Sequence, residues 1–404
     1  MKGLLYSIMI SLMLIPMLGL IIFYSQASTT RNIDVDIRAN ELEYFTKSIE
    51  KDLTRSLEIN GKRSMISAVS NVIIDGVGLD SAPLRLAEMI ENGTLYGVTA
   101  PLVDTSNLQF WKLKVEDIAS ESGFNVDFDN IQIYINQNDS FNVLFSVNVT
   151  LNISDKLETM GIEKVITSNA LVSIENIEDP SFPLNTYGRV LRFIRKSNAS
   201  KDNSFLVQGL NSSGYVSGDS FVINSSDLTV GHADKILVTD TVAGKEAIAS
   251  VFKGVVSEGD VVIPAGLMGK AITGATDARS KVRNNTKIYL DQNTRKVWDL
   301  ANLTQDIKNG YYQSSDSGAS FLDRLEGNKT LSPEYAYGIE TFVYLPDLTD
   351  ADIPVNTLAS CLDYQYWQDI VGGEIRNGNY DPVYSWFKID GNNAIIYGIG
   401  DLIT

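Results

Sequence analysis

The chain offers few side chains for metal or nucleophilic chemistry. It has one histidine, His232, and one cysteine, Cys361. One imidazole and one thiol are too few for the ligand sets that hold zinc. No serine lies in the G-x-S-x-G turn that exposes the nucleophile of many hydrolases. We therefore expect His232 in a solvated loop and Cys361 as a small buried apolar side chain.

One glycine-rich segment, "AGLMGKAITG" at residues 265–274, invites comparison with a phosphate-binding loop. That loop needs four residues between its first glycine and its Gly-Lys pair, with Ser or Thr after the lysine. Here two residues separate Gly266 from Gly269, and Ala271 follows Lys270. The segment therefore does not predict a nucleotide site.

One acidic segment, "DLTDADIP", places Asp347, Asp350 and Asp352 close together. Carboxylates are calcium ligands, but the segment lacks the glycine and the closing glutamate of a calcium-binding helix-loop-helix. An ordinary acidic turn is the favoured interpretation, and calcium binding is the alternative. We expect no cofactor and no other metal site.

The charge balance excludes one class of partner. The formal net charge is −17, with 44% apolar and 21% charged residues. Nucleic-acid binding needs clustered lysine and arginine, and the sequence has no such cluster. We expect globular domains that do not bind nucleic acid.

The first thirty residues predict a membrane anchor. No charged residue lies between Gly3 and Thr30, and residues 4–23 are mainly apolar, which is enough for a helix to cross a bilayer once. Lys2 precedes this run, so the remainder should lie outside the cell, giving a single-pass protein of the cell membrane. A signal peptide cleaved after residues 25–27, "SQA", is the alternative.

An amphipathic helix is expected directly after the anchor, over residues 33–57 and ending near Asn60-Gly61. Two uses of its apolar stripe remain open: packing against a partner helix, so that an oligomer is possible, or packing against the chain's own ectodomain. The stripe consists of Leu42, Phe45, Ile49, Leu53 and Leu57.

Further periodicities predict an α+β module. Helices are expected around residues 65–73 and over 81–93 and 107–122. Strands are expected over residues 124–135, with a bulge at Asp129-Asn130, then over 141–154 and 166–174. The helices followed by an antiparallel meander make an α+β fold.

The strand at residues 141–154 is apolar at every odd position. Its water-facing side carries the start of two Asn-x-Ser/Thr triplets, the acceptor sequence for N-linked sugars. Glycosylation requires surface positions, and an outward-facing chain would supply them. The ten candidate acceptors are Asn92, Asn138, Asn148, Asn152, Asn198, Asn211, Asn224, Asn284, Asn302 and Asn328.

The remaining sequence predicts a β-rich second domain. We expect an anchor at residues 1–30, a membrane-proximal α+β domain at 31–184 and a distal β-rich α+β domain at 185–404. Asp390-Gly391 predicts a tight hairpin. Other elements are expected as strands at 234–241, 251–256, 260–266, 286–291, 296–300 and 338–345, and as helices at 303–310 and 318–326.

Aromatic side chains gather in the last 70 residues. They either form a sheet core or recognise sugars or proteins through their polar ends. They are Tyr335, Tyr337, Tyr344, Tyr364, Tyr366, Tyr380, Tyr384, Tyr397, Trp367 and Trp386.

An apolar N-terminal helix that runs into an amphipathic one and then an α+β head resembles archaeal type IV pilin-like surface proteins. Lys2-Gly3 before the apolar run suits their short leader cleavage, but Ile8 stands where such pilins favour glutamate. "SGASFLDRLEGN" (317–328) and "YGIETFVYLPDL" (337–348) resemble stretches of uncharacterised membrane-anchored archaeal proteins. The resemblance implies surface display, with pilus or surface-layer proteins as partners.

Three functional hypotheses follow. The leading one is a non-enzymatic, glycosylated envelope protein for adhesion or surface assembly. The second is a membrane-anchored hydrolase or solute-binding protein that acts on glycans or peptides outside the membrane. The third is a subunit of a membrane transporter.

Overall fold

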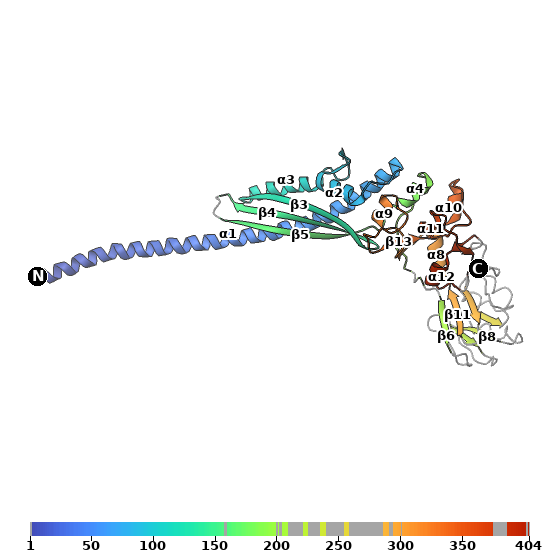
Figure 1. Cartoon of the computed structure of the whole chain (residues 1–404). Coiled ribbons are helices and arrows are strands. Elements are labelled where there is room, and N and C mark those ends of the chain that lie inside the picture. The colour runs from blue at the N-terminus through green and yellow to red at the C-terminus, as the bar shows by residue number, and fades with distance from the viewer. Residues whose placement is uncertain are drawn as a thin grey trace. The chain divides into compact units, whose positions relative to one another are not determined.

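A computed structural model of the chain describes its fold (Figure 1). It does not describe the side chains of residues 2–16, 19, 24–36, 301 and 302, nor those of the strands between residues 204 and 299. The described backbone covers residues 2–156, 160–198, 201, 204–208, 221–224, 235–239, 254–257, 286–290, 294–299, 301–374, 386–400 and 403.

The fold is α+β, as expected, with small and mostly antiparallel sheets. The helices are α1 (Lys2–Asp75), α2 (Ala82–Asn92), α3 (Leu108–Glu121), α4 (Ser181–Thr186), α8 (Ala301–Asn309), α9 (Phe321–Leu325), α10 (Leu345–Asp350), α11 (Asp363–Tyr366) and α12 (Gly391–Ile396). The chain divides into two compact units, with residues 1–67, 83–135 and 144–172 in unit 1 and residues 68–82, 136–143 and 173–404 in unit 2.

The three long strands form one antiparallel sheet in the order β3-β4-β5. They are β3 (Phe124–Asp139), β4 (Asn142–Asp155) and β5 (Gly161–Ser173). Burial alternates along the whole of β4, which confirms the alternation expected for residues 141–154. Asn130 has a φ of 51°, and this left-handed residue lies where the bulge at Asp129-Asn130 is expected within β3.

The other strands are short. They are β1 (Thr94–Leu95), β2 (Val98–Thr99), β6 (Ser204–Gln208), β7 (Phe221–Asn224), β8 (Lys235–Thr239), β9 (Gly254–Ser257), β10 (Thr286–Leu290), β11 (Thr294–Asp299), β12 (Tyr312–Ser315), β13 (Gly338–Thr341), β14 (Gly373–Glu374) and β15 (Lys388–Ile389). β10 and β11 pair antiparallel, whereas β7, β8 and β9 form a parallel sheet.

The expected end of the amphipathic helix at Asn60-Gly61 is wrong, because α1 continues to Asp75. Gly61 lies inside the helix, at a position where the sheet packs against it. A Cβ atom on Gly61 would meet the Phe145 ring at 3.0 Å and Val172 at 3.1 Å. The glycine therefore serves close packing of helix against sheet and not a helix end.

Capping residues define the boundaries of α2 and α3, close to the ranges 81–93 and 107–122 that the sequence predicts. Asn107 caps α3, since its side chain accepts a hydrogen bond from the Phe110 N–H at 2.9 Å. Gly93 and Gly123 follow α2 and α3 with φ of 72° and 86°. Only glycine takes this left-handed conformation without strain.

The expected hairpin at Asp390-Gly391 is wrong. Asp390 is instead the N-cap of α12, and its side chain accepts hydrogen bonds from the Asn392 and Asn393 N–H groups, both at 3.0 Å. The strand expected at residues 338–345 ends early, at Thr341. Pro346 lies in the first turn of α10, where its missing N–H costs nothing.

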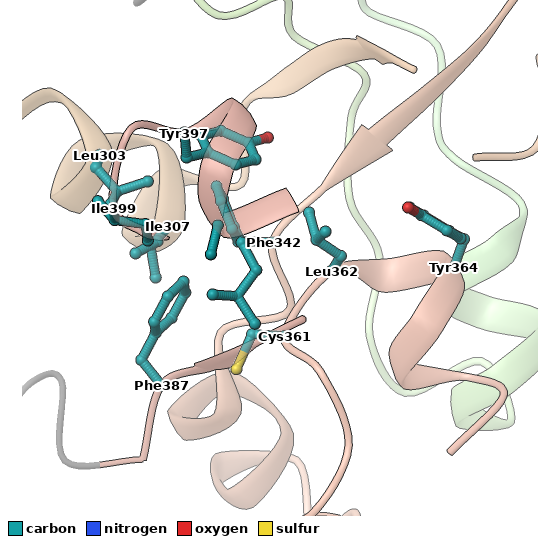
Figure 2. Packing of buried hydrophobic residues seen from close by; sticks show 11 residues of the cluster. Leu303, Ile307, Phe342, Cys361, Leu362, Tyr364, Phe387, Tyr397 and Ile399 are labelled. Carbon is teal, nitrogen blue, oxygen red and sulfur yellow. The ribbon is translucent and has the colours of Figure 1, made fainter. Parts of the chain in front are cut away.

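Unit 2 has an aromatic core (Figure 2). Phe342 lies at its centre, with ring centroids 5.6 Å from Phe387 and 5.1 Å from Tyr397. Leu303 of α8 packs in the same cluster. Cys361 is 1% exposed, so the expectation that it is a buried apolar residue is confirmed.

Candidate functional site

The first candidate surface is the start of α1. Six of its large apolar side chains are exposed by 48–69%: Met17, Leu18, Leu20, Ile21, Ile22 and Phe23. Because 3.6 residues make one turn, these six positions face every direction around the helix. A helix that is apolar on all sides needs an apolar environment on all sides.

Most of the expected membrane segment, residues 4–23, lies outside the residues whose side chains the structure describes. In the part that it does describe, no helix has both the length and the apolar character that a bilayer crossing requires. The transmembrane part of the expected fold is therefore not supported.

The stripe of α1 is the second candidate surface, and its side chains pack within unit 1. Leu42, Ile49, Leu53 and Leu57 are each at most 4% exposed. Phe45 is half-buried and stacks on Phe124 of β3, with ring centroids 5.4 Å apart. These contacts are the packing that the ectodomain alternative predicts.

The outer face of the sheet carries two sugar-acceptor candidates. Asn148 and Asn152 of β4 are both half-buried. The Asn152 side-chain amide donates a hydrogen bond to Asp129 Oδ2 at 3.0 Å. Neighbouring positions on this face are open, since Val165 and Leu171 of β5 are 67% and 65% exposed.

The other acceptor candidates lie on separate surfaces. Four are exposed: Asn92, Asn138, Asn198 and Asn328. The positions of Asn211 and Asn284, and the side chains of Asn224 and Asn302, lie outside the described residues. His232 and the segment at residues 265–274 do so as well.

The three aspartates considered for calcium do not form a ligand set. Among the described residues, no group of three or more histidine, cysteine or carboxylate side chains could hold a metal ion. Asp347 Oδ2 instead lies 3.2 Å from Arg192 Nη2. The pKa of Asp347 is raised, because the effect of burial outweighs the opposing effect of the Arg192 guanidinium. An ordinary acidic segment explains "DLTDADIP".

Most of the described distal tyrosines belong to the core. Tyr335, Tyr364, Tyr366 and Tyr397 are each at most 8% exposed. The hydroxyls of Tyr364, Tyr366 and Tyr397 have hydrogen-bond partners inside unit 2. The Glu340 carboxylate, for example, accepts a hydrogen bond from the Tyr397 hydroxyl at 2.9 Å. The interpretation of this cluster as a recognition surface therefore loses its basis for these four side chains.

A buried ion cluster joins separate segments of unit 2, and sequence reasoning missed it. The Arg324 guanidinium lies 2.7 Å from both Asp179 Oδ2 and Asp363 Oδ2. All three side chains are at most 1% exposed. The Tyr312 hydroxyl donates a second hydrogen bond to Asp179 Oδ2, at 2.7 Å. This geometry is typical of a structural cluster, because its polar groups are used on one another.

The electrostatics of the cluster agree with that interpretation. Burial raises the pKa of Asp363 in spite of Arg324, and burial and Asp179 together raise the pKa of Tyr312. The two carboxylates raise the pKa of Arg324 although burial opposes its charge. The arginine therefore stays charged, and no group of the cluster reaches solvent to act on a ligand.

One signal in the sequence points toward this cluster. Ser320 and Asp323 form a reciprocal capping box at the start of α9, the S-x-x-D pattern that precedes many helices. The box fixes α9, which then carries Arg324 into the core. The partners Asp179 and Asp363 come from distant segments and carry no such signal.

No protein-family model, curated protein or solved structure shows a significant match to this chain.

Proposed function

We propose that this chain is a non-enzymatic, pilin-like protein of the cell envelope, anchored through the apolar start of α1 and displaying its α+β units outside the cell. The anchor would be residues 4–23, and the chain would carry N-linked sugars on its exposed acceptors. Adhesion or assembly with pilus or surface-layer proteins is the role that this arrangement serves.

The observation that carries the proposal is the contrast along α1. The stripe residues Leu42, Ile49, Leu53 and Leu57 are buried in unit 1, whereas the apolar side chains at residues 17, 18 and 20–23 are exposed around the helix. Exposing so much contiguous apolar surface to water is unfavourable, at roughly 25 cal/mol per Å². Lipid or packed neighbouring helices remove that cost, and the uncharged run from Gly3 to Thr30 suits either environment.

The surface of unit 1 supports display outside the cell. The half-buried outer face of β4 carries two sugar-acceptor triplets, and exposed acceptors occur in both units. The buried charges of Arg324, Asp179 and Asp363 pair with one another, which supports a structural role for this cluster.

The proposal is tested by membrane extraction of the full chain at alkaline pH, which removes peripheral proteins. The wild-type chain should stay in the membrane pellet. Replacing Ile21 and Ile22 together by glutamate should move it to the supernatant, because a charge in such a segment costs up to about 2.5–3.5 kcal/mol, most of all at its centre.

The matched control replaces Val165 and Leu171 by glutamate, two apolar residues of the sheet that are 67% and 65% exposed, somewhat more than Ile21 and Ile22 at 57% and 56%. This control should stay in the pellet with the wild type. A wild-type chain in the supernatant would contradict the proposal.

A further inference from the structure

Unit 1 contains a groove of about 350 Å³ between α1 and α3. The two helices are joined within the groove by the Trp111 indole, which donates a hydrogen bond to Asp52 Oδ2 at 2.8 Å. The residues that line it recur at three- and four-residue steps on each helix, so each helix presents one face to the groove.

The charges in the groove are mostly positive. The lining includes three cationic side chains, Arg55 and Arg63 of α1 and Lys114 of α3. It includes one carboxylate, Asp52, which already accepts a hydrogen bond from the Trp111 indole. Neither arginine makes an ion pair within the described part of the chain. In a chain of net charge −17 this is a local excess of positive charge, and it favours an anionic ligand.

The spacing of the arginines indicates the size of that ligand. Arg55 and Arg63 are eight residues apart on one helix, which places their backbones about 12 Å apart along the axis. A single small anion cannot contact both guanidinium groups without bending the side chains together. A chain-like ligand with several charges can pair with them separately.

Neutral groups in the same groove favour a sugar. Asn60 is 2% exposed and its Oδ1 has no hydrogen-bond partner, and the buried Oγ of Ser106 has none either. Leaving such an atom without a donor costs about 1–3 kcal/mol, which a ligand hydroxyl reaching the floor would recover. Phe110 at the rim is 40% exposed and offers a flat apolar surface.

We propose that this groove binds an acidic polysaccharide, with Arg55, Arg63 and Lys114 pairing its carboxylates and Phe110 contacting a sugar ring. The biological encounter rests on the proposed function, which places the groove outside the cell. The binding itself is independent of location and is measured on the purified chain.

The test is calorimetric titration of the detergent-purified full chain with a hexamer of galacturonic acid. At 0.15 M salt the screening length is about 8 Å, so the groove's own charges outweigh the distant acidic surface. We expect binding that Arg55→Gln and Arg63→Gln each weaken about tenfold, as expected for loss of a charge-assisted contact. Phe110→Ala should also weaken it.

The control is Arg38→Gln, since Arg38 is exposed on the same helix and pairs with its neighbour Glu41, at 3.0 Å. This variant should bind like the wild type. Absence of binding, or equal binding by the Arg55 and Arg63 variants, would overturn the proposal. The proposal would also be overturned, in favour of an acidic peptide, if hexaglutamate bound as tightly as the galacturonic acid hexamer and Phe110→Ala did not weaken that binding.

Discussion

Arg324 and Asp179 form an ion pair of 2.7 Å whose side chains are 1% and 0% exposed. We expect Arg324→Met to destabilise unit 2 by about 3–5 kcal/mol, because Asp179 and Asp363 would remain buried without their cation. The loss of stability is measured by urea unfolding, with the reactivity of the Cys361 thiol as the probe of the unfolding of unit 2. The control Arg189→Met, at an exposed arginine of the same unit, should change stability by less than about 0.5 kcal/mol. Equal stability of both variants would contradict the structural role of the cluster.

Cys361 should be inert in the folded chain. It is 1% exposed, and burial raises the pKa of its thiol to about 12. Because the thiolate is the reactive form, alkylation at pH 8 should be slow until unit 2 unfolds. A colorimetric thiol assay with and without denaturant measures the difference. Fast modification of the native chain would mean that the core around Phe342 is open.

Leu53 tests the packing of the α1 stripe. It is completely buried, and Leu53→Ala should destabilise unit 1 by about 2–5 kcal/mol through the cavity that it leaves. Trp111, which packs on Phe128 with ring centroids 5.2 Å apart, reports unfolding of unit 1 by its fluorescence. Glu58→Ala on the exposed side of the same helix should have little effect. An unchanged midpoint for Leu53→Ala would show that this stripe does not pack as described.

Asp306 should make unit 2 less stable as the pH rises. It accepts hydrogen bonds from Ser197 at 2.8 Å and from Gln313 at 3.2 Å, yet burial raises its pKa above the ordinary 3.8. The folded chain therefore keeps this proton to a higher pH than the unfolded chain does. The contribution of Asp306 to the free energy of unfolding falls as the pH rises from 3.8 through the pKa of the folded state. Above that pKa the contribution is constant.

Asp306→Asn removes that dependence. The free energy of unfolding of the variant, relative to the wild type, should increase with pH over this interval and then level off. Asp316→Asn, at an exposed carboxylate of the same unit, is the control and should give a flat difference. A flat difference for Asp306→Asn as well would contradict the burial effect.

Local patterns predicted the elements whose stability depends on nearby residues. The alternation of β4 and the caps of α2 and α3 follow from residues within a few positions of one another. Asp390-Gly391 shows the limit of such patterns, because aspartate before glycine suits both a hairpin and a helix N-cap. The choice of N-cap depends on the core that α12 joins, to which Ala394 and Tyr397 contribute.

The features that the sequence did not predict are tertiary. Gly61 is typical of a helix end, and only the approach of Phe145 and Val172 explains a glycine there. The Arg324 cluster joins residues 145 and 39 positions apart in the sequence, between Asp179, Arg324 and Asp363. The groove between α1 and α3 likewise forms only when the two helices pack. No local sequence motif therefore marks its arginine and lysine side chains.

The central claim, that the units lie outside the cell, is tested most directly by thiol labelling of intact cells. Leu171→Cys places a thiol at a position on β5 that is 65% exposed, and the wild type, whose Cys361 is buried, is the control. A membrane-impermeant maleimide should label the variant equally in intact and lysed cells and leave the wild type unlabelled. Labelling of the variant only after lysis would contradict the account.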